Sequence, residues 1–191
     1  MPSTTLTPQQ IIRKNAAGEP LSPDEPKRVS RHIIAVLVEN SIGALNRIVN
    51  MFSARGFNLE SVAVGETDDP TVSRLTIVTT GDDRIIAQVN RQLNRLVDVL
   101  DVQDLTDQEY VERELCLLKV AYSQENRSEL MGTLEIFRGK VVDVTTETMT
   151  FELTGPTKKI NAFIGMMKPH GIKEIARSGR VAMCRALQFG D

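Results

Sequence analysis

The chain has 191 residues, 41% of them hydrophobic, and a formal net charge of −2. This length allows one large or two small domains with buried cores, and the net charge argues against a nucleic-acid partner, which requires clustered positive charge. The longest apolar run, Ile33 to Val38, is six residues, far short of the ~20 that cross a bilayer. We therefore expect a globular, cytoplasmic protein that binds neither nucleic acid nor membrane.

Residues 1–30 are rich in proline and polar side chains. Five of the eight prolines lie here, at Pro2, Pro8, Pro20, Pro23 and Pro26. Such a segment has too little apolar surface to offset the entropy lost on ordering. We expect a disordered N-terminal extension. A short helical turn that docks on a partner is the alternative.

Residues 31–106 have the pattern of a βαββαβ unit. The stretch "HIIAVLV" lacks polar alternation, which predicts a strand buried on both faces. An apolar stripe with helical spacing, Leu45 to Phe52, follows and ends before Gly56, a residue suited to positive φ. The strands "FNLESVAVG" and "VSRLTIVTT" then flank an Asp-Asp-Pro turn, which predicts an antiparallel hairpin.

A second helix and a closing strand complete this unit. The helix "GDDRIIAQVNRQL" begins with aspartates suited to capping and has one apolar face. The strand "VDVLDVQDL" alternates, which predicts Val99 and Val102 on opposite faces.

Residues 112–185 repeat the same order. The matching segments, in chain order, are "ELCLLKVAY", "RSELMGTLEIF", "GKVVDVT", "MTFELTG", "PTKKINAFIGMM" and "GIKEIARSG". The sequence therefore predicts an α+β fold of two tandem ferredoxin-like domains, residues 31–106 and 112–185. The turn after the first strand differs between the copies, because "ENSIGAL" contains a glycine and "YSQENRSEL" does not.

This turn, Asn40 to Gly43, has two interpretations. It either ends a strand and caps a helix, or it binds the head group of an amino acid. In the second case the helix N-terminus and Gly43 accommodate a carboxylate, and Asn40 and Asn58 supply amide groups for an ammonium. The aliphatic neighbours Ile42 and Leu45 suit a branched side chain. The candidate effector-binding residues are Asn40, Ser41, Ile42, Gly43, Ala44, Leu45 and Asn58.

The sequence offers no convincing catalytic or metal site. Its two histidines, His32 and His170, have no Cys or carboxylate at metal-ligand spacing. Asp68 and Asp69 stand beside a proline, as turn residues do. The two cysteines have apolar neighbours, as buried thiols in a reducing compartment do. We assign no catalytic residue and expect no metal or cofactor on this chain.

Residues 31 to about 185 resemble the regulatory small subunit of acetohydroxyacid synthase, also called acetolactate synthase. The resemblance rests on "HIIAVLVENSIGALNRIVNMFSARGFNLESVAVG", "DDPTVSRLTIVTTGDD", "LVDVLDV", "VERELCLLKV", "EIFRGKVVDVT" and "EIARSGRVA". It implies an N-terminal ACT domain and a C-terminal ACT-like domain. It also implies an effector site between the ACT domains of two subunits, in which Asn40, Gly43 and Asn58 match the family motif.

The resemblance further implies a non-catalytic homodimer that binds and activates the large catalytic subunit. It implies feedback inhibition by a branched-chain amino acid, usually valine. Thiamine diphosphate, FAD and Mg would belong to the large subunit. Two alternatives are a free-standing amino-acid-sensing ACT protein that acts on another enzyme and a ferredoxin-like RNA-binding module. An RNA-binding module of this fold needs stacking aromatic residues on its central strands, and the expected central strands of this chain contain none.

Overall fold

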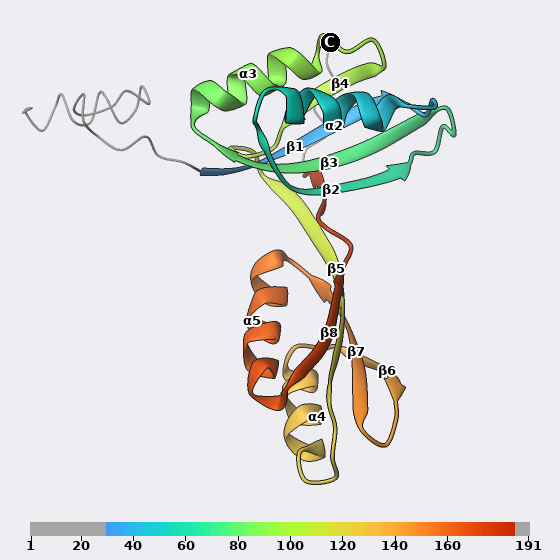
Figure 1. Ribbon diagram of the computed structural model, residues 1–191, viewed down its shortest axis with the longest axis vertical. Coiled ribbons are helices and arrows are strands. Elements are labelled where there is room, and N and C mark those ends of the chain that lie inside the picture. Colours follow the sequence, from blue (N-terminus) through green and yellow to red (C-terminus); the bar gives the residue numbers. More distant parts are fainter. Residues whose placement is uncertain (1–29, 186–191) are drawn as a thin grey trace, which may run out of the picture.

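The computed structural model describes residues 30–185. Within them the chain forms two antiparallel sheets, each with two α-helices on one face (Figure 1). The predicted α+β class and the repeated βαββαβ order are confirmed. The predicted extension, residues 1–30, lies outside the described residues except for Ser30.

Each unit follows the predicted element order. The first comprises β1 (Ser30–Glu39), α2 (Ala44–Ala54), β2 (Asn58–Glu66), β3 (Val72–Gly81), α3 (Asp83–Leu93) and β4 (Val99–Asp104). The second comprises β5 (Tyr110–Ala121), α4 (Arg127–Ile136), β6 (Lys140–Val144), β7 (Thr148–Gly155), α5 (Thr157–Met167), the short 3-10 helix η1 (Lys168–His170) and β8 (Ile172–Arg177). The strand orders, β2-β3-β1-β4 and β6-β7-β5-β8, are equivalent.

The helices begin and end where local chemistry favours it. The Asp82 side chain caps α3 by accepting a hydrogen bond from the Ile85 amide at 2.9 Å. Gly56, just after α2, has φ +68°, a conformation that glycine adopts without steric cost. Both features agree with the sequence analysis.

Strand β1 is buried on both faces, as predicted. Ile34 and Val36 belong to a core beneath α2 and α3 that includes Phe52 and Leu93. The opposite face, around Ile33 and its neighbours, is covered by a different part of the chain. This second cover was not predicted.

The second cover is a two-stranded ribbon built from β5 and a C-terminal strand, β9 (Val181–Cys184). Residues 110–113 of β5 pair with β9, and the rest of this strand continues into the second sheet. Ala182 of β9, 1% exposed, packs with Ile33, Ala35 and Leu105. Its amide donates to Thr76 Oγ1 of β3 at 3.3 Å. The last strand of the chain therefore returns to the first sheet.

One prediction within β4 was wrong. The pairing register between β1 and β4 shifts, so that Leu37 opposes Asp101 and Val38 opposes Val99. Leu100 is the extra residue and is 52% exposed. Because a bulge reverses strand alternation, Val99 and Val102 both pack against the core beneath the helices instead of lying on opposite faces.

The contact of β9 with the first sheet leads to a stability prediction. Ala182→Leu adds three carbons where the structure has no space, and such overpacking costs about 1 to 3 kcal/mol. We expect a loss of that size in the free energy of unfolding, measured by urea denaturation. The control is Met183→Leu on the same strand, because Met183 is 59% exposed. Equal stability of both variants would contradict the packing of β9.

Candidate functional site

The turn between β1 and α2 depends on the backbone conformation of Gly43. This residue stands at the N-cap of α2 with φ +87°, which disfavours any side chain. The Ser41 carbonyl accepts from the Ala44 amide at 3.2 Å, and the Gly43 carbonyl accepts from the Arg47 backbone amide at 2.9 Å. Gly43 is thus required by the turn itself, in addition to the access for a ligand that the sequence suggested.

Asn40 ties this turn to the β2–β3 hairpin. Its Nδ2 donates to the Pro70 carbonyl at 2.9 Å and to Glu66 Oε1 at 3.2 Å. Its backbone amide donates to the Thr71 carbonyl at 2.7 Å. Because the donors of Asn40 serve the fold, its Oδ1 is the atom suited to accept from a ligand ammonium.

The aliphatic residues of the turn do not form a closed pocket in one chain. Ile42 is fully exposed and Leu45 is 40% exposed, whereas Ala44 is buried in the fold. A ligand bound only to this chain would leave its side chain in water. Any apolar enclosure must come from outside the described chain.

The sequence analysis missed an ion pair that supports the turn. The Arg47 guanidinium makes a bidentate interaction with the Asp98 carboxylate, through Nε to Oδ2 and through Nη2 to Oδ1 at 2.6 Å. Ser41 Oγ donates to Asp98 Oδ1 at 3.4 Å. Arg47 Nη1 lies 3.0 Å from the position that a Cβ on Gly43 would occupy. A guanidinium therefore lies against the turn where a carboxylate would approach.

The electrostatics of this pair follow from its geometry. The hydrogen bond from Arg47 lowers the pKa of Asp98 below its ordinary value, although partial burial opposes the shift. The sequence gives no signal that Arg47 and Asp98 are partners, because they come together only when β4 pairs with β1. The backbone carbonyl of Asp98 also accepts from the Glu39 amide at 2.8 Å.

Asn58 lies at the other end of the sheet from the turn. It opposes Thr80 of β3, whereas Asn40 is hydrogen-bonded to Thr71, the residue just before that strand. Nine residues of strand correspond to about 30 Å. Within one chain, the structure therefore does not bring Asn58 together with Asn40 and Gly43.

The described residues show no metal-binding cluster and no membrane-spanning helix. Among residues 30–185, no three or more His, Cys, Asp and Glu side chains gather as metal ligands would. In the same range no helix is both long and apolar enough to cross a bilayer. Cys116 is buried and Cys184 is half-buried, both as free thiols.

Comparisons with known proteins cover both units. The family described as "AHAS small subunit-like ACT domain" matches residues 34–101, and "Small subunit of acetolactate synthase" matches residues 113–186. The acetolactate synthase small subunit of Aquifex aeolicus is 52% identical over 165 residues, which cover 86% of each chain. The chain therefore belongs to the acetolactate synthase small-subunit family.

Other members of the family agree in sequence and in structure. The acetolactate synthase isozyme 3 small subunit of Escherichia coli is 46% identical and aligns with 81% of this chain and 96% of its own. The crystal structure of the small subunit from Thermotoga maritima superposes with a TM-score of 0.76 at 40% identity. That match covers 82% of this chain and 98% of the other. As a small subunit, the chain is a regulatory, non-catalytic partner of the large catalytic subunit.

The Arg47–Asp98 pair leads to a prediction about pH. Because its pKa is lowered in the folded state, Asp98 stabilises the small subunit above the unfolded pKa of about 3.9, and this contribution is lost as the pH falls through the folded pKa. Arg47→Gln should raise the pKa of Asp98, as measured by NMR titration of its carboxyl carbon. Asp69, whose pKa is lowered by hydrogen bonds from Thr71, is the internal control and should not change. An unmoved Asp98 pKa would contradict the pairing.

Proposed function

We propose that this small subunit binds a branched-chain amino acid between two copies of its first unit, and that binding inhibits the large subunit that it otherwise activates. Valine is the first candidate effector. The proposed contacts are Asn40, Ser41, Ile42, Gly43, Ala44 and Leu45 from one copy and Asn58 from the other. The proposed domains are residues 31–106 and 112–185, and the proposed location is the cytoplasm.

One observation carries this proposal: the candidate residues lie at opposite ends of an edge strand. Strand β2 is at the edge of the first sheet, begins at Asn58 and ends at Glu66, which is hydrogen-bonded to Asn40. Edge strands have unpaired N–H and C=O groups. If two β2 strands pair antiparallel about a two-fold axis, Asn58 of one copy lies beside the turn of the other.

A homodimer would also enclose the side chain of the effector. Ile42 and Leu45 are exposed in one chain, as is Val64 of β2, at 53%. A second copy would remove such apolar surface from water, at roughly 25 cal/mol per Å². The paired edges thus offer the apolar enclosure that a single turn lacks, next to a helix N-terminus suited to a carboxylate.

The chemistry itself would belong to the partner. In the proposed holoenzyme the large subunit carries thiamine diphosphate, FAD and Mg, and this chain contributes regulation alone. Membership of the small-subunit family favours this function over a free-standing ACT protein and over an RNA-binding module.

A charge placed in the turn should weaken inhibition. Gly43→Asp puts a negative side chain where the effector carboxylate must bind, and like charges a few ångströms apart cost on the order of 1 to 4 kcal/mol at effective dielectrics of 80 to 20. The half-inhibiting concentration of valine should rise by about fivefold to several hundredfold. The measurement is inhibition of the reconstituted holoenzyme by valine, leucine and isoleucine.

The matched control is Gly56→Asp at the other end of α2. Gly56 also has positive φ, +68°, and no atom lies within 4 Å of the position of its added Cβ. Both variants thus carry the same kind of backbone strain and the same added charge. Inhibition that weakens equally in both variants, or in neither, would refute an effector carboxylate at Gly43.

The self-association of the small subunit is a separate prediction. We expect a dimer by sedimentation at micromolar concentration, because an unpaired β2 edge and its apolar neighbours favour pairing. Asn58→Ala should remain dimeric and lose one ligand hydrogen bond, worth about 0.5 to 3 kcal/mol. A monomer both with and without valine would contradict the shared site.

A further inference from the structure

The turn between β8 and β9, Ser178–Arg180, connects the second sheet to the first. We call it the junction turn. Its Ser178 side chain accepts from the Leu115 amide at 3.0 Å, and its backbone amide donates to the Leu115 carbonyl at 3.1 Å. Immediately afterwards, Ala182 is hydrogen-bonded to Thr76 of the first sheet. The junction turn is therefore fixed to both units at once.

Gly179 brings the junction turn against the edge strand β2. Its φ is +79°, and a Cβ added there would lie 3.6 Å from Ser61 Cβ, 3.7 Å from the Val62 carbonyl oxygen and 3.8 Å from Ala63 Cβ. Gly179 therefore lies next to the middle of β2, and an added methyl group would be in van der Waals contact with the strand. A displacement of β2 toward Gly179 would therefore push the junction turn out of its position.

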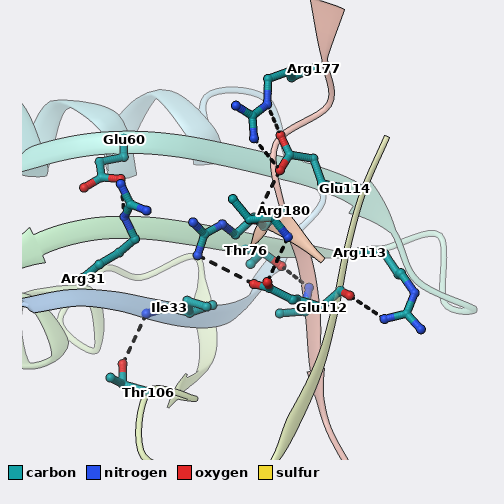
Figure 2. Close-up of polar contacts among 12 residues, drawn as sticks. Arg31, Ile33, Glu60, Thr76, Thr106, Glu112, Arg113, Glu114, Arg177 and Arg180 are labelled. Carbon is teal, nitrogen blue, oxygen red and sulfur yellow. Dashed lines mark hydrogen bonds and ion pairs between the residues drawn. The ribbon is translucent and has the colours of Figure 1, made fainter. Parts of the chain in front are cut away.

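Arginines on either side of Gly179 and Ser178 pair with glutamates of β5 (Figure 2). Arg177, just before the turn, makes a bidentate interaction with Glu114, at 2.5 and 2.8 Å. Arg180 Nη1 lies 3.6 Å from Glu112 Oε2. These two glutamates meet the first residue of α5, where the Thr157 amide donates to Glu112 and the Thr157 hydroxyl to Glu114.

The buried member of this cluster is Glu114, which is 4% exposed. Burial alone would raise its pKa, but hydrogen bonding and charge from Arg177, aided by Thr157, lower it. A buried carboxylate is costly without such partners. The cluster therefore constrains where Arg177, and with it the junction turn, can lie.

A polar cleft of about 330 Å³ separates the two units beside this cluster. Arg31, Glu60 and Ser61 line it from the first unit, and Asn161 and Arg177 from the second. Polar contacts between units permit relative movement more readily than a packed apolar interface does. The two units are thus joined at the junction turn, and the cleft beside it leaves space for a small movement of one unit relative to the other.

We propose that the junction turn transmits effector binding from β2 to the second sheet and helix α5. This inference rests on the proposed function, because β2 is the strand that would pair and contribute Asn58 to the effector. When a ligand and a second copy bind along β2, the position of the strand relative to Gly179 changes. Arg177 and Arg180 carry this change to α5 through Glu114 and Glu112.

The first test compares two glycines with nearly the same positive φ, +79° at Gly179 and +78° at Gly171. Gly179→Ala adds a methyl group against β2, whereas Gly171→Ala adds one at φ +78° inside the second unit, next to Ala121. In the holoenzyme, Gly179→Ala should raise the half-inhibiting concentration of valine at least about fivefold, the lower end of typical allosteric couplings. Activation without valine should remain, and Gly171→Ala should behave as the parent.

Binding of valine to the isolated small subunit, measured by calorimetry, separates transmission from recognition. For Gly179→Ala we expect unchanged affinity in this assay together with weakened inhibition of the holoenzyme. Unchanged inhibition, or a loss fully accounted for by weaker binding, would overturn the inference. If the parent chain itself binds no branched-chain amino acid, the proposed function fails and this inference fails with it.

A second variant covers the case in which Gly179→Ala does not fold, as judged by circular dichroism. Arg180→Gln removes the charge facing Glu112 and leaves the backbone free to keep its conformation. Its control is Lys119→Gln, which removes an exposed ion pair with Glu174 in the second sheet. Arg180→Gln should weaken inhibition without weakening binding, and Lys119→Gln should do neither. The same half-inhibiting concentration of valine for Arg180→Gln and Lys119→Gln would contradict the inference.

Discussion

Strand β1 is buried on both of its faces, and each face is covered by a different part of the chain. Helices α2 and α3 cover one face, and the ribbon of β5 and β9 covers the other. Because β9 follows the second sheet in sequence, the first unit is complete only when the end of the chain has returned to it. The small subunit is therefore one connected structure, in which the second sheet is held to the first by β5 and by the junction turn (Figure 1).

This arrangement gives the edge strand β2 two roles. Gly179 of the junction turn lies next to its middle, and the strand has one candidate ligand residue, Asn58, at its start. Its other end is tied to Asn40 through Glu66. The length of the strand keeps the two halves of the candidate site apart in one chain, which is the physical reason for proposing that two copies complete it.

Much of the fold could be predicted from the sequence, because local chemistry and periodicity determine it. The uninterrupted apolar run predicted a doubly buried β1, and the aspartates before Ile85 predicted the cap of α3. The bulge at Leu100 was not predictable, since alternation gives no signal of an extra residue. The β9 cover was also missed, because four residues with one small buried alanine carry little periodicity.

The candidate site was predictable in its parts but not in its geometry. Gly43 and Asn40 were identified from the turn, yet the backbone requirement for glycine and the hairpin contacts of Asn40 needed the structure. The Arg47–Asp98 pair joins residues 51 positions apart, and only strand pairing brings them together. Asn58 was named for its amide group and for its match to the family motif. Its position at the far end of β2 is the reason for proposing that it completes the site of a different copy.

The most direct test of a site shared between copies is a mixed dimer of Gly43→Asp and Asn58→Ala small subunits, purified with two different tags. In this dimer both substitutions fall in one of the two shared sites, and the other site has only parent residues. Calorimetry with valine should then detect one class of sites with the affinity of the parent, at about half its binding capacity. Neither homodimer should contain that class. A mixed dimer with only the weakened affinities of the two homodimers would mean that each site lies within a single chain.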